Sequence, residues 1–288
     1  MTAESDFIAA LRLAANHPAA RGLADDCAVL EIGGTAIVLT HDSMLEGVHF
    51  LSGQDPADVA WKLVATNMSD LAAKGARPIG VLLSYQLGAD DTRFAAGLAE
   101  ALSFYHAELL GGDTVGGAGP QHLGLTAFGA ATTIPVPSRS GARPGDGVWI
   151  SGPVGAAMLG LEALKSGDGD PRPYVRPIAL MEAGIALAPL VSAMMDVSDG
   201  LLLDCSRMAQ ASAVTIDIQR MAVPIAADES RRNEALTWGD DYQLLFTAAH
   251  DAALPVPAHR IGSVLPPGRH HLLVDGSPPR GNLGYQHG

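Results

Sequence analysis

Aspartates are the residues of this sequence with the clearest capacity for chemistry, because they stand where apolar strands end or inside an apolar helix. The set consists of Asp26, Asp42, Asp70, Asp113, Asp196 and Asp199. Strand ends converge at one edge of an α/β sheet, so carboxylates placed there can meet in space. Carboxylates gathered without enough cations repel one another and cannot all ionise. We therefore predict that the set binds Mg²⁺, which takes oxygen ligands and is usually completed by substrate phosphates.

Each of these aspartates also has a plainer interpretation, which the sequence leaves open. Asp199 could cap a helix, and Asp113 could be a turn residue. Asp42 could open an Asx-turn, and Asp26 could lie at a solvated strand edge. Asp70 is harder to explain in this way, because a carboxylate among apolar helical neighbours costs solvation energy unless it is paired. Lys74 follows four residues later, so a pair within the helix is the alternative there.

One arginine accompanies the aspartates. Arg139 lies in the Ser/Gly-rich segment 138–146, where a guanidinium suits bidentate contact with a phosphate. A solvated loop between domains is the alternative. The sequence has no Walker A loop, because no lysine in it follows a glycine, and it lacks G-x-S-x-G and H-E-x-x-H motifs. A phosphate group would therefore be held by Arg139 and by metal ions that bridge it to aspartates.

The composition sets limits on the partners. The 288 residues include 18 Lys and Arg against 31 Asp and Glu, a net charge of −13, which argues against a binder of nucleic acid or of anionic membranes. Cys27 and Cys205 lack the spacing of metal ligands and are expected to be reduced and buried. The acidic first residues lack a signal-peptide pattern, and no apolar run is long enough to cross a bilayer. We expect a cytoplasmic protein.

The hydrophobic pattern predicts two α/β domains that join near residue 137. In the first, we expect strands at 27–32, 35–42, 79–87 and 122–133, helices at 56–74 and 91–110, and a turn at 111–114. The segment 134–137 is the predicted boundary, because two prolines in four residues cannot join a central strand. Beyond it we expect strands at 147–151, 194–197, 214–219, 242–249, 259–264 and 270–274, and helices at 155–166, 178–194 and 201–211.

Seven segments, taken in order, resemble motifs of the thiamine-monophosphate kinase family, within the ATP-binding aminoimidazole-ribotide-synthetase-like superfamily. They are Asp-Asp-Cys-Ala at 25–28, Thr-His-Asp at 40–42 with Gly-Val-His-Phe at 47–50, Asn-Met-Ser-Asp-Leu-Ala-Ala at 67–73, Gly-Gly-Asp-Thr at 111–114, Ser-Arg-Ser-Gly-Ala at 138–142, Asp-Val-Ser-Asp-Gly at 196–200 and Gly-Asp-Asp-Tyr at 239–242. The resemblance implies a two-domain aminoimidazole-ribotide-synthetase-like fold with mixed sheets flanked by helices. Its parts would be an N-terminal α/β domain (1–137) with the metal and ATP site and a C-terminal α+β domain (138–288) with nucleotide and substrate contacts.

The resemblance also implies an activity, namely direct in-line transfer of the ATP γ-phosphoryl group to thiamine monophosphate with several Mg²⁺ ions. It implies metal ligands at Asp26, Thr40, Asp42, Asp70, Asp113, Asp196 and Asp199. It implies contacts to ATP from Gly112, Asp113, Arg139, Ser198 and Tyr105. It implies contacts to the thiamine substrate from His49, Asp240 and Tyr285. The expected catalytic residues are Asp42, Asp113, Asp199 and Arg139, and a homodimer is expected through the sheet of the first domain.

Two departures from the family pattern and two alternative functions stand beside this prediction. His41 replaces a common hydroxyl residue, and Asp240 replaces a glutamate that is one methylene longer, so we expect a looser or water-bridged thiamine contact. Another ATP-using enzyme of the superfamily, such as an aminoimidazole-ribotide synthetase-like or selenophosphate synthetase-like protein, is the first alternative. A non-catalytic acidic metal-binding protein is the second, but it gives no role to Arg139, His49 or Tyr285.

Overall fold

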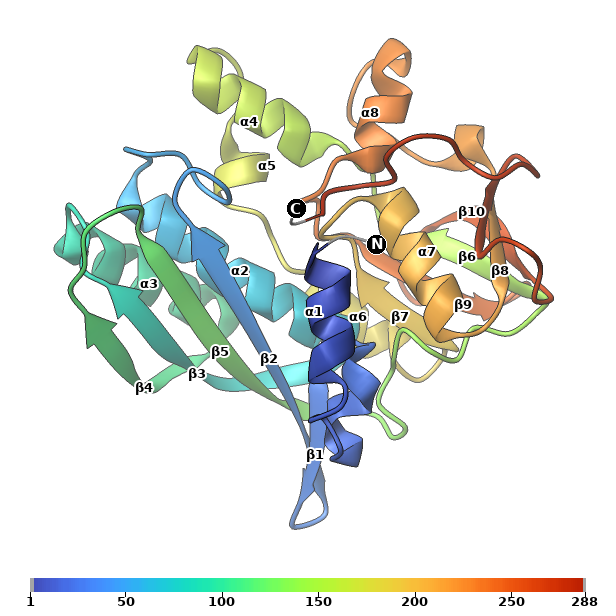
Figure 1. Ribbon diagram of the computed structural model, residues 1–288, viewed down its shortest axis with the longest axis horizontal. Helices are drawn as coiled ribbons and strands as arrows, with labels where there is room; N and C mark the ends of the chain where they lie inside the picture. The colour runs from blue at the N-terminus through green and yellow to red at the C-terminus, as the bar shows by residue number, and fades with distance from the viewer. Residues whose placement is uncertain (1–2, 287–288) are drawn as a thin grey trace.

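The computed structural model describes residues 3–286 and contains two β-sheets, each flanked by helices (Figure 1). The elements of the first half are α1 (Ala3–Leu11), β1 (Ala28–Ile32), β2 (Thr35–Leu45), α2 (Pro56–Ala73), β3 (Ala76–Gln86), α3 (Asp91–Tyr105), β4 (Glu108–Val115) and β5 (His122–Ala131). The strands form a sheet in the order β1-β2-β5-β3-β4. Its pairs are antiparallel except for β3 and β4, which run parallel, so the sheet is mixed.

The second half builds a six-stranded sheet in the order β11-β8-β10-β6-β9-β7. Its elements are β6 (Asp146–Ile150), α4 (Ala156–Ser166), α5 (Arg172–Val175), α6 (Met181–Leu187), β7 (Ala193–Asp196), α7 (Leu201–Ala211), β8 (Thr215–Ile218), α8 (Arg232–Thr237), β9 (Leu244–Ala249), β10 (His259–Leu265) and β11 (Leu272–Val274). The six strands agree with the predicted strand positions to within two residues at each end. The expected fold class of mixed sheets flanked by helices is confirmed.

Helix α2 lies between the two halves of the molecule. The Asp55 side chain accepts a hydrogen bond from the Ala57 N–H at 2.9 Å, and Pro56 occupies the first turn, so the helix begins where the sequence predicts. One face packs on β2, β5 and α3, and another contacts α6 and β7 of the second half. Both faces are therefore buried. Polar residues of α2 that face inward, such as Asp70, must find partners inside the protein.

The structure corrects the predicted end of the second helix. Helix α3 stops at Tyr105, because His106 adopts the left-handed conformation with φ 54° and closes the last turn. The following residues form strand β4, parallel to β3, and not the predicted continuation to 110 and turn at 111–114. Leu109 and Leu110 extend the apolar pattern of the helix, which explains the wrong boundary. Helix α6 is likewise shorter than the predicted 178–194, since Pro189 stands just after its end.

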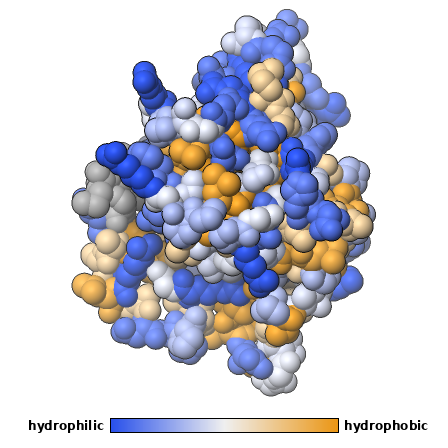
Figure 2. All heavy atoms as spheres, turned by 90° about the vertical axis from the view of Figure 1, so that its right-hand side faces the viewer, coloured by the Kyte–Doolittle hydropathy of each residue, from blue (hydrophilic) through white to orange (hydrophobic). Residues whose placement is uncertain are grey.

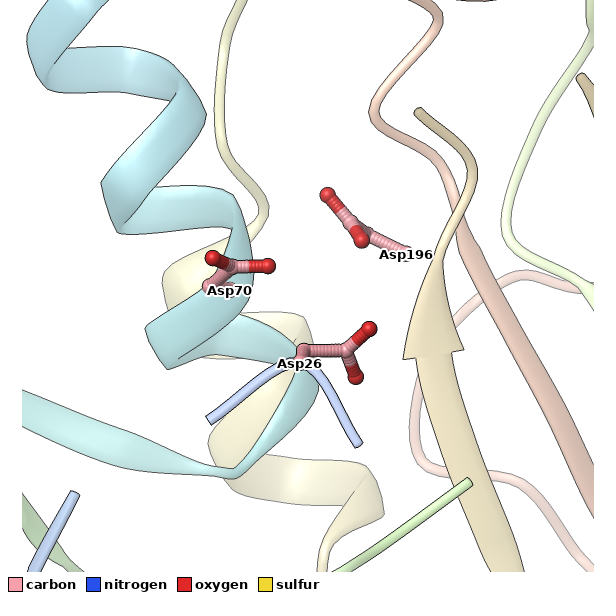
Figure 3. A group of neighbouring side chains, drawn as sticks. All are labelled: Asp26, Asp70 and Asp196. Atoms are coloured by element: carbon pink, nitrogen blue, oxygen red, sulfur yellow. The ribbon is translucent and has the colours of Figure 1, made fainter. Parts of the chain in front are cut away.

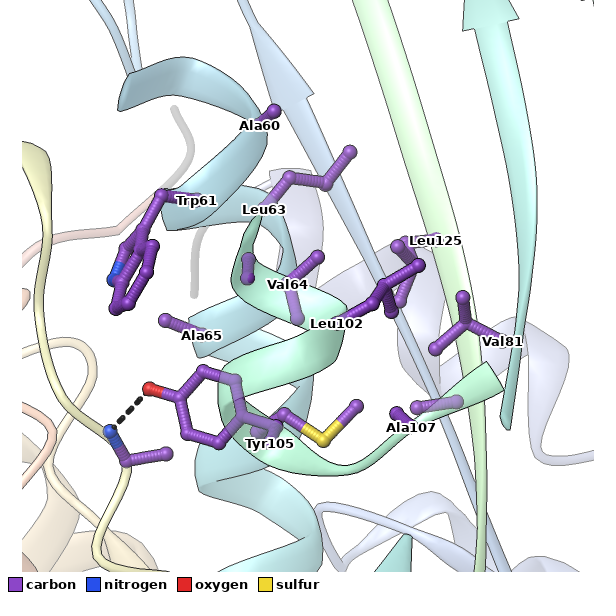
Figure 4. Packing of buried hydrophobic residues seen from close by; sticks show 14 of the residues in the cluster. Ala60, Trp61, Leu63, Val64, Ala65, Val81, Leu102, Tyr105, Ala107 and Leu125 are labelled. Carbon is purple, nitrogen blue, oxygen red and sulfur yellow. Dashed lines mark hydrogen bonds between the residues drawn. The ribbon is translucent and has the colours of Figure 1, made fainter. Parts of the chain in front are cut away.

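The core of the first half forms where α2 and α3 meet the sheet. Figure 4 shows Trp61 and Val64 of α2 beside Leu102 and Tyr105 of α3, with Leu125 of β5 on the side of the sheet. Polar and charged residues cover much of the face that the second half presents in Figure 2, with apolar residues between them. None of the helices within residues 3–286 is long and apolar enough to cross a membrane.

Candidate active site

Three aspartates from distant parts of the chain meet between the two halves. Asp26 precedes β1, Asp70 lies in α2 and Asp196 ends β7, and one carboxylate oxygen of each lies within 4.8 Å of the others. Figure 3 shows these carboxylates around a common space between α2 and β7. We call these three residues the aspartate cluster. The structure thus brings together three of the seven predicted metal ligands.

Two hydroxyl groups fix the orientation of the cluster. The Thr40 hydroxyl on β2 donates a hydrogen bond to Asp70 Oδ2. The Ser69 hydroxyl on α2 donates to Asp196 Oδ2 at 2.6 Å and so links the first half of the chain to the second. Thr40 is buried and its oxygen lies beside the cluster, and the family resemblance implies a metal ligand at this residue.

The electrostatics of the cluster favour the binding of a cation. Burial, together with the negative charge of Asp26, raises the pKa of Asp196 to about 8. Burial and the charges of Asp42 and Asp196 raise the pKa of Asp70 well above its ordinary value. A divalent cation would favour the ionised carboxylates and offset their repulsion. Since the donors are carboxylate and hydroxyl oxygens, the residues present fit Mg²⁺.

Two basic side chains bind the two carboxylate oxygens of Asp26. The Lys74 ammonium donates to Asp26 Oδ2, and Arg139 Nε donates to Asp26 Oδ1 at 2.7 Å. Lys74 also lies 2.7 Å from Asp25 Oδ1. Burial alone would raise the pKa of Asp25, but the charge and hydrogen bond of Lys74 hold that pKa well below its usual range. The alternative pair between Asp70 and Lys74 is therefore wrong, because Lys74 follows the last turn of α2 and reaches the segment before β1.

Asp42 borders the cluster on strand β2. Its backbone N–H donates to the Asn67 side-chain oxygen at 3.2 Å, which ties this part of the strand to α2. Burial, with the negative charges of Asp199 and Asp26, raises the pKa of the Asp42 carboxyl to about 6. Asp42 therefore lies within the electrostatic field of both the cluster and the turn that carries Asp199.

The turn before α7 carries Ser198 and Asp199. The N-cap of α7 is Gly200, without a side-chain hydrogen bond, so the interpretation of Asp199 as a cap is wrong. The Asp199 carboxylate instead accepts a hydrogen bond from Arg207. The buried Asp204 carboxylate accepts from the Ser198 N–H at 3.2 Å and the Asp199 N–H at 3.1 Å. Asp204 thereby fixes the backbone of the turn.

The three predicted thiamine contacts lie on linked segments. The Lys62 ammonium donates to the His49 carbonyl at 3.0 Å and to Asp240 Oδ2 at 2.8 Å. The Tyr285 N–H donates to the Asp199 carbonyl at 2.8 Å, which places the backbone of the half-exposed Tyr285 beside the turn before α7. His49, Asp240 and Tyr285 are thus connected to the surroundings of the cluster through backbone and lysine contacts.

Gly112 and Asp113 lie far from the aspartate cluster of the same chain. The register across the sheet is Asp42, Leu125, Leu83 and Gly112, each on a neighbouring strand. Neighbouring strands lie about 4.8 Å apart, so roughly 14 Å of sheet separates Asp42 from Gly112. Asp113 follows on the edge strand β4, where all eight residues are exposed. Its carboxylate accepts a hydrogen bond from the Thr114 N–H at 2.9 Å.

Tyr105 lies in the hydrophobic core and is 5% exposed. Its ring packs against Trp61 and Phe104, and its hydroxyl accepts a hydrogen bond from the Ala179 N–H at 2.9 Å (Figure 4). In this position the ring supports the segment between the two halves and has no open face for a nucleotide.

Known proteins resemble this chain over both halves. The AIR synthase related protein, N-terminal domain, matches residues 24–131, and the AIR synthase related protein, C-terminal domain, matches residues 143–272. The thiamine-monophosphate kinase of Escherichia coli (strain K12) is 36% identical over 250 residues, which cover 78% of this chain and 75% of that protein. The thiamine-monophosphate kinase of Caulobacter vibrioides is 37% identical over 266 residues, covering 84% and 76%.

The chain belongs to the thiamine-monophosphate kinase family. A solved structure described as "AaThiL complexed with AMPPCP and TMP" has a TM-score of 0.87 and 30% identity, and the match covers 98% of this chain and 96% of that one. The family resemblance and the two-part fold expected from the sequence are confirmed.

Three residues around the site lie outside the family motifs of the sequence. They are Lys62, Arg207 and Asp204. Lys62 carries a usable signal, since it is the one charged residue in the apolar helical run 59–65. Asp204 carries a similar one, because it interrupts the run Leu-Leu-Leu-Asp-Cys. A charged residue in such a run needs a buried partner, which points toward a polar site.

Proposed function

We propose that this chain transfers the γ-phosphoryl group of ATP directly to thiamine monophosphate and so forms thiamine diphosphate and ADP. The observation that carries the proposal is the meeting of Asp26, Asp70 and Asp196 within 4.8 Å in a member of this family. The solved relative described as complexed with AMPPCP and TMP supports the same pair of substrates, an ATP analogue and a thiamine phosphate.

The proposed metal is Mg²⁺, held by the aspartate cluster and its neighbours. The ligands would be Asp26, Thr40, Asp42, Asp70, Asp196 and Asp199, with Asp113 discussed below. When bound, Mg²⁺ supplies the positive charge that phosphate oxygens need in an acidic site. The oxygens of the cluster already face a common space (Figure 3), so little rearrangement of these side chains is required.

We place the phosphates of ATP beside Arg139 and Ser198. Arg139 has a side chain that is 19% exposed and is bound to Asp26, so its guanidinium is at the edge of the cluster. From there it can turn one face of its planar fork toward a phosphate. The Ser198 N–H donates to Asp204, which fixes the main chain that carries the Ser198 hydroxyl. Tyr105 is not part of this proposal, because its ring is buried.

We place the thiamine moiety between His49, Asp240 and Tyr285. Asp240 supplies negative charge near a cationic heterocycle, and the half-exposed Tyr285 ring offers a surface for stacking. Asp240 is shorter than the glutamate of the family pattern, so this contact would be looser or bridged by water. The division of the chain near residue 137 and a cytoplasmic location, where ATP is available, belong to the same proposal.

We further propose a homodimer that completes the site. Strand β4 is an edge strand with every residue exposed, including Leu109, Leu110 and Val115, each at least half exposed. A long apolar edge strand is a template for pairing with another chain. Pairing through this sheet would bring Gly112 and Asp113 of one copy to the cluster of the other, because they cannot reach their own.

One assay tests the proposed function. Purified protein is incubated with ATP, Mg²⁺ and thiamine monophosphate, and thiamine diphosphate is measured by chromatography. We expect the product to depend on all three components. ATP turnover with another acceptor but no thiamine diphosphate would favour another enzyme of the superfamily. Metal binding with no turnover of ATP on any acceptor would favour the non-catalytic alternative.

A further inference from the structure

Lys74 is a buried cation placed directly against the aspartate cluster. Its side chain is 0% exposed, and it follows α2 as the C-cap residue. The ammonium donates to Asp26 Oδ2 and to the Met194 carbonyl at 3.2 Å, and it lies 2.7 Å from Asp25 Oδ1. These three partners satisfy the three donors of an ammonium group. Lys74 therefore has no freedom to leave for a substrate.

The position of Lys74 differs from that of Arg139, the other cation on Asp26. Arg139 lies on a loop and is partly exposed, so it can exchange Asp26 for a phosphate. Lys74 joins both halves of the chain, because Asp26 precedes β1 and Met194 lies on β7. Its charge stays in the site whatever binds there. Two of the three lysines in the whole sequence, Lys62 and Lys74, are buried in this way along α2.

We propose that Lys74 is a built-in cation of the metal site, which takes the place of part of the charge that Mg²⁺ would otherwise supply. It holds Asp26 in position when metal is absent, and it lowers the amount of Mg²⁺ that the cluster takes up. This inference rests on the proposed metal binding by the cluster. Lys74 is a positioning residue, since it touches a ligand and not the substrates.

Lys74 differs from a lysine in an ordinary buried ion pair, because its partner is a member of the aspartate cluster. Lys62 is the matched comparison, because it lies in α2, the helix that Lys74 follows, is 1% exposed and has an acid and a carbonyl as partners. Its acid is Asp240, which is not a member of the cluster. Both Lys62→Met and Lys74→Met lose a buried ion pair, but only Lys74→Met leaves the cluster with one more uncompensated negative charge.

The experiment compares Mg²⁺ binding and thermal unfolding of the wild-type protein, Lys74→Met and Lys62→Met, with Mg²⁺ as the only added ligand. All three are purified in Mg²⁺ and then transferred to EDTA. We expect both variants to unfold at lower temperature in EDTA. We expect Mg²⁺ to raise the unfolding temperature of Lys74→Met by more than it raises that of the wild type. We also expect Lys74→Met to be half-saturated at an Mg²⁺ concentration about tenfold lower, since a unit charge a few Å from an ion changes its binding by at least that factor.

Lys62→Met should differ from Lys74→Met, because Mg²⁺ should raise its unfolding temperature by the same amount as it raises that of the wild type. Equal or weaker Mg²⁺ binding by Lys74→Met would overturn the inference. If Lys74→Met does not fold even in Mg²⁺, Lys74→Gln, which keeps a hydrogen-bond donor for Asp26 but carries no charge, is measured in the same way. No gain in Mg²⁺ response there would also overturn it. These readouts need no substrate, so a failed kinase assay with intact Mg²⁺ binding would reject the proposed reaction alone.

Discussion

The Lys62 ammonium lies 2.8 Å from the Asp240 carboxylate, although the two residues come from different halves of the chain. It also donates to the His49 carbonyl at 3.0 Å and lies 3.7 Å from the centre of the Tyr174 ring. The Tyr242 hydroxyl donates to the other oxygen of Asp240 at 2.8 Å. One buried lysine thus fixes the relative positions of His49 and Asp240, the proposed thiamine contacts.

Replacement of Lys62 by methionine keeps the length of the side chain but removes the cation from Asp240. We expect KM for thiamine monophosphate to rise about tenfold or more, because Asp240 and the His49 segment lose their common anchor, while KM for ATP changes by less than about twofold. Steady-state kinetics with each substrate varied in turn measure both constants.

The control for that variant is Lys165→Met, which changes the exposed lysine of α4. Its two KM values should match those of the wild type. If Lys62→Met raised both KM values equally, Lys62 would have a general structural role and not a role in placing the thiamine contacts.

A second prediction concerns Asp204, which is 0% exposed and accepts the N–H groups of Ser198 and Asp199. In Asp204→Asn the amide retains one acceptor oxygen but loses the charge that holds Arg207. We expect the free energy of unfolding to fall by about 1–3 kcal/mol. We expect kcat to fall by about 10–100-fold, because support of a metal ligand by its outer partners is worth roughly that much.

The comparison for Asp204→Asn is Asp168→Asn, in the exposed loop after α4. Chemical denaturation and Mg²⁺ titrations of the rate are measured on both variants. A purely structural Asp204 would lower stability with kcat and the half-saturating Mg²⁺ unchanged, which would count against its positioning role.

Most of the fold follows from local signals. Asp55 and Pro56 mark the start of α2, and Gly33 and Gly34 mark the hairpin between β1 and β2, as the structure shows. Strand β4 was not predictable in this way. It has no buried face within the chain, so the alternation that identifies a strand is missing. Only its pairing with β3, which the sequence does not encode locally, makes it a strand.

The site was predictable in part for a related reason. Strand ends and apolar helices point to Asp26, Asp70 and Asp196, and the fold brings these together. The partner of Lys74 was not predictable, because helical spacing favours Asp70, whereas the tertiary fold offers the Asp25–Asp26 pair. Sequence spacing describes contacts within one element and carries no information on contacts between elements.

The third prediction concerns pH in the metal-free protein. Asp196 has a pKa of about 8 in the folded state because of burial, against an unfolded value of about 4. Between these values the unfolded chain releases the proton that the folded state keeps. The contribution of Asp196 to the free energy of unfolding is therefore fully present below about pH 4. It is lost as pH rises toward 8, by up to about 1.4 kcal/mol per pH unit for one such group.

Thermal unfolding in EDTA at several pH values checks this dependence. We expect a lower unfolding temperature at pH 8 than at pH 6, and a larger stabilisation by Mg²⁺ at pH 8, because Mg²⁺ favours the ionised carboxylate. Asp196→Asn removes the titrating group and should flatten the profile. A profile of Asp196→Asn as steep as that of the wild type would assign the effect to other groups.

The fourth prediction tests whether Asp113 acts on the cluster of a second copy. Asp42→Asn and Asp113→Asn should each lower kcat by at least about 100-fold, because each removes a proposed metal ligand that faces the transferred phosphate. In a mixed dimer of the two variants, one site then carries both substitutions, whereas the other carries neither. Unfolding and refolding an equal mixture makes about half of the dimers mixed, so activity should return to about a quarter of the wild-type value.

Two outcomes oppose this arrangement. If Asp113 served the cluster of its own chain, every site in a mixed dimer would carry one substitution, and the refolded mixture would stay as inactive as its parents. A wild-type protein that is monomeric at assay concentrations, by sedimentation, and still active would reject the shared site as well. The prediction of a shared site rests on the roughly 14 Å of sheet between Asp42 and Gly112, since three strand spacings exceed the reach of an aspartate side chain.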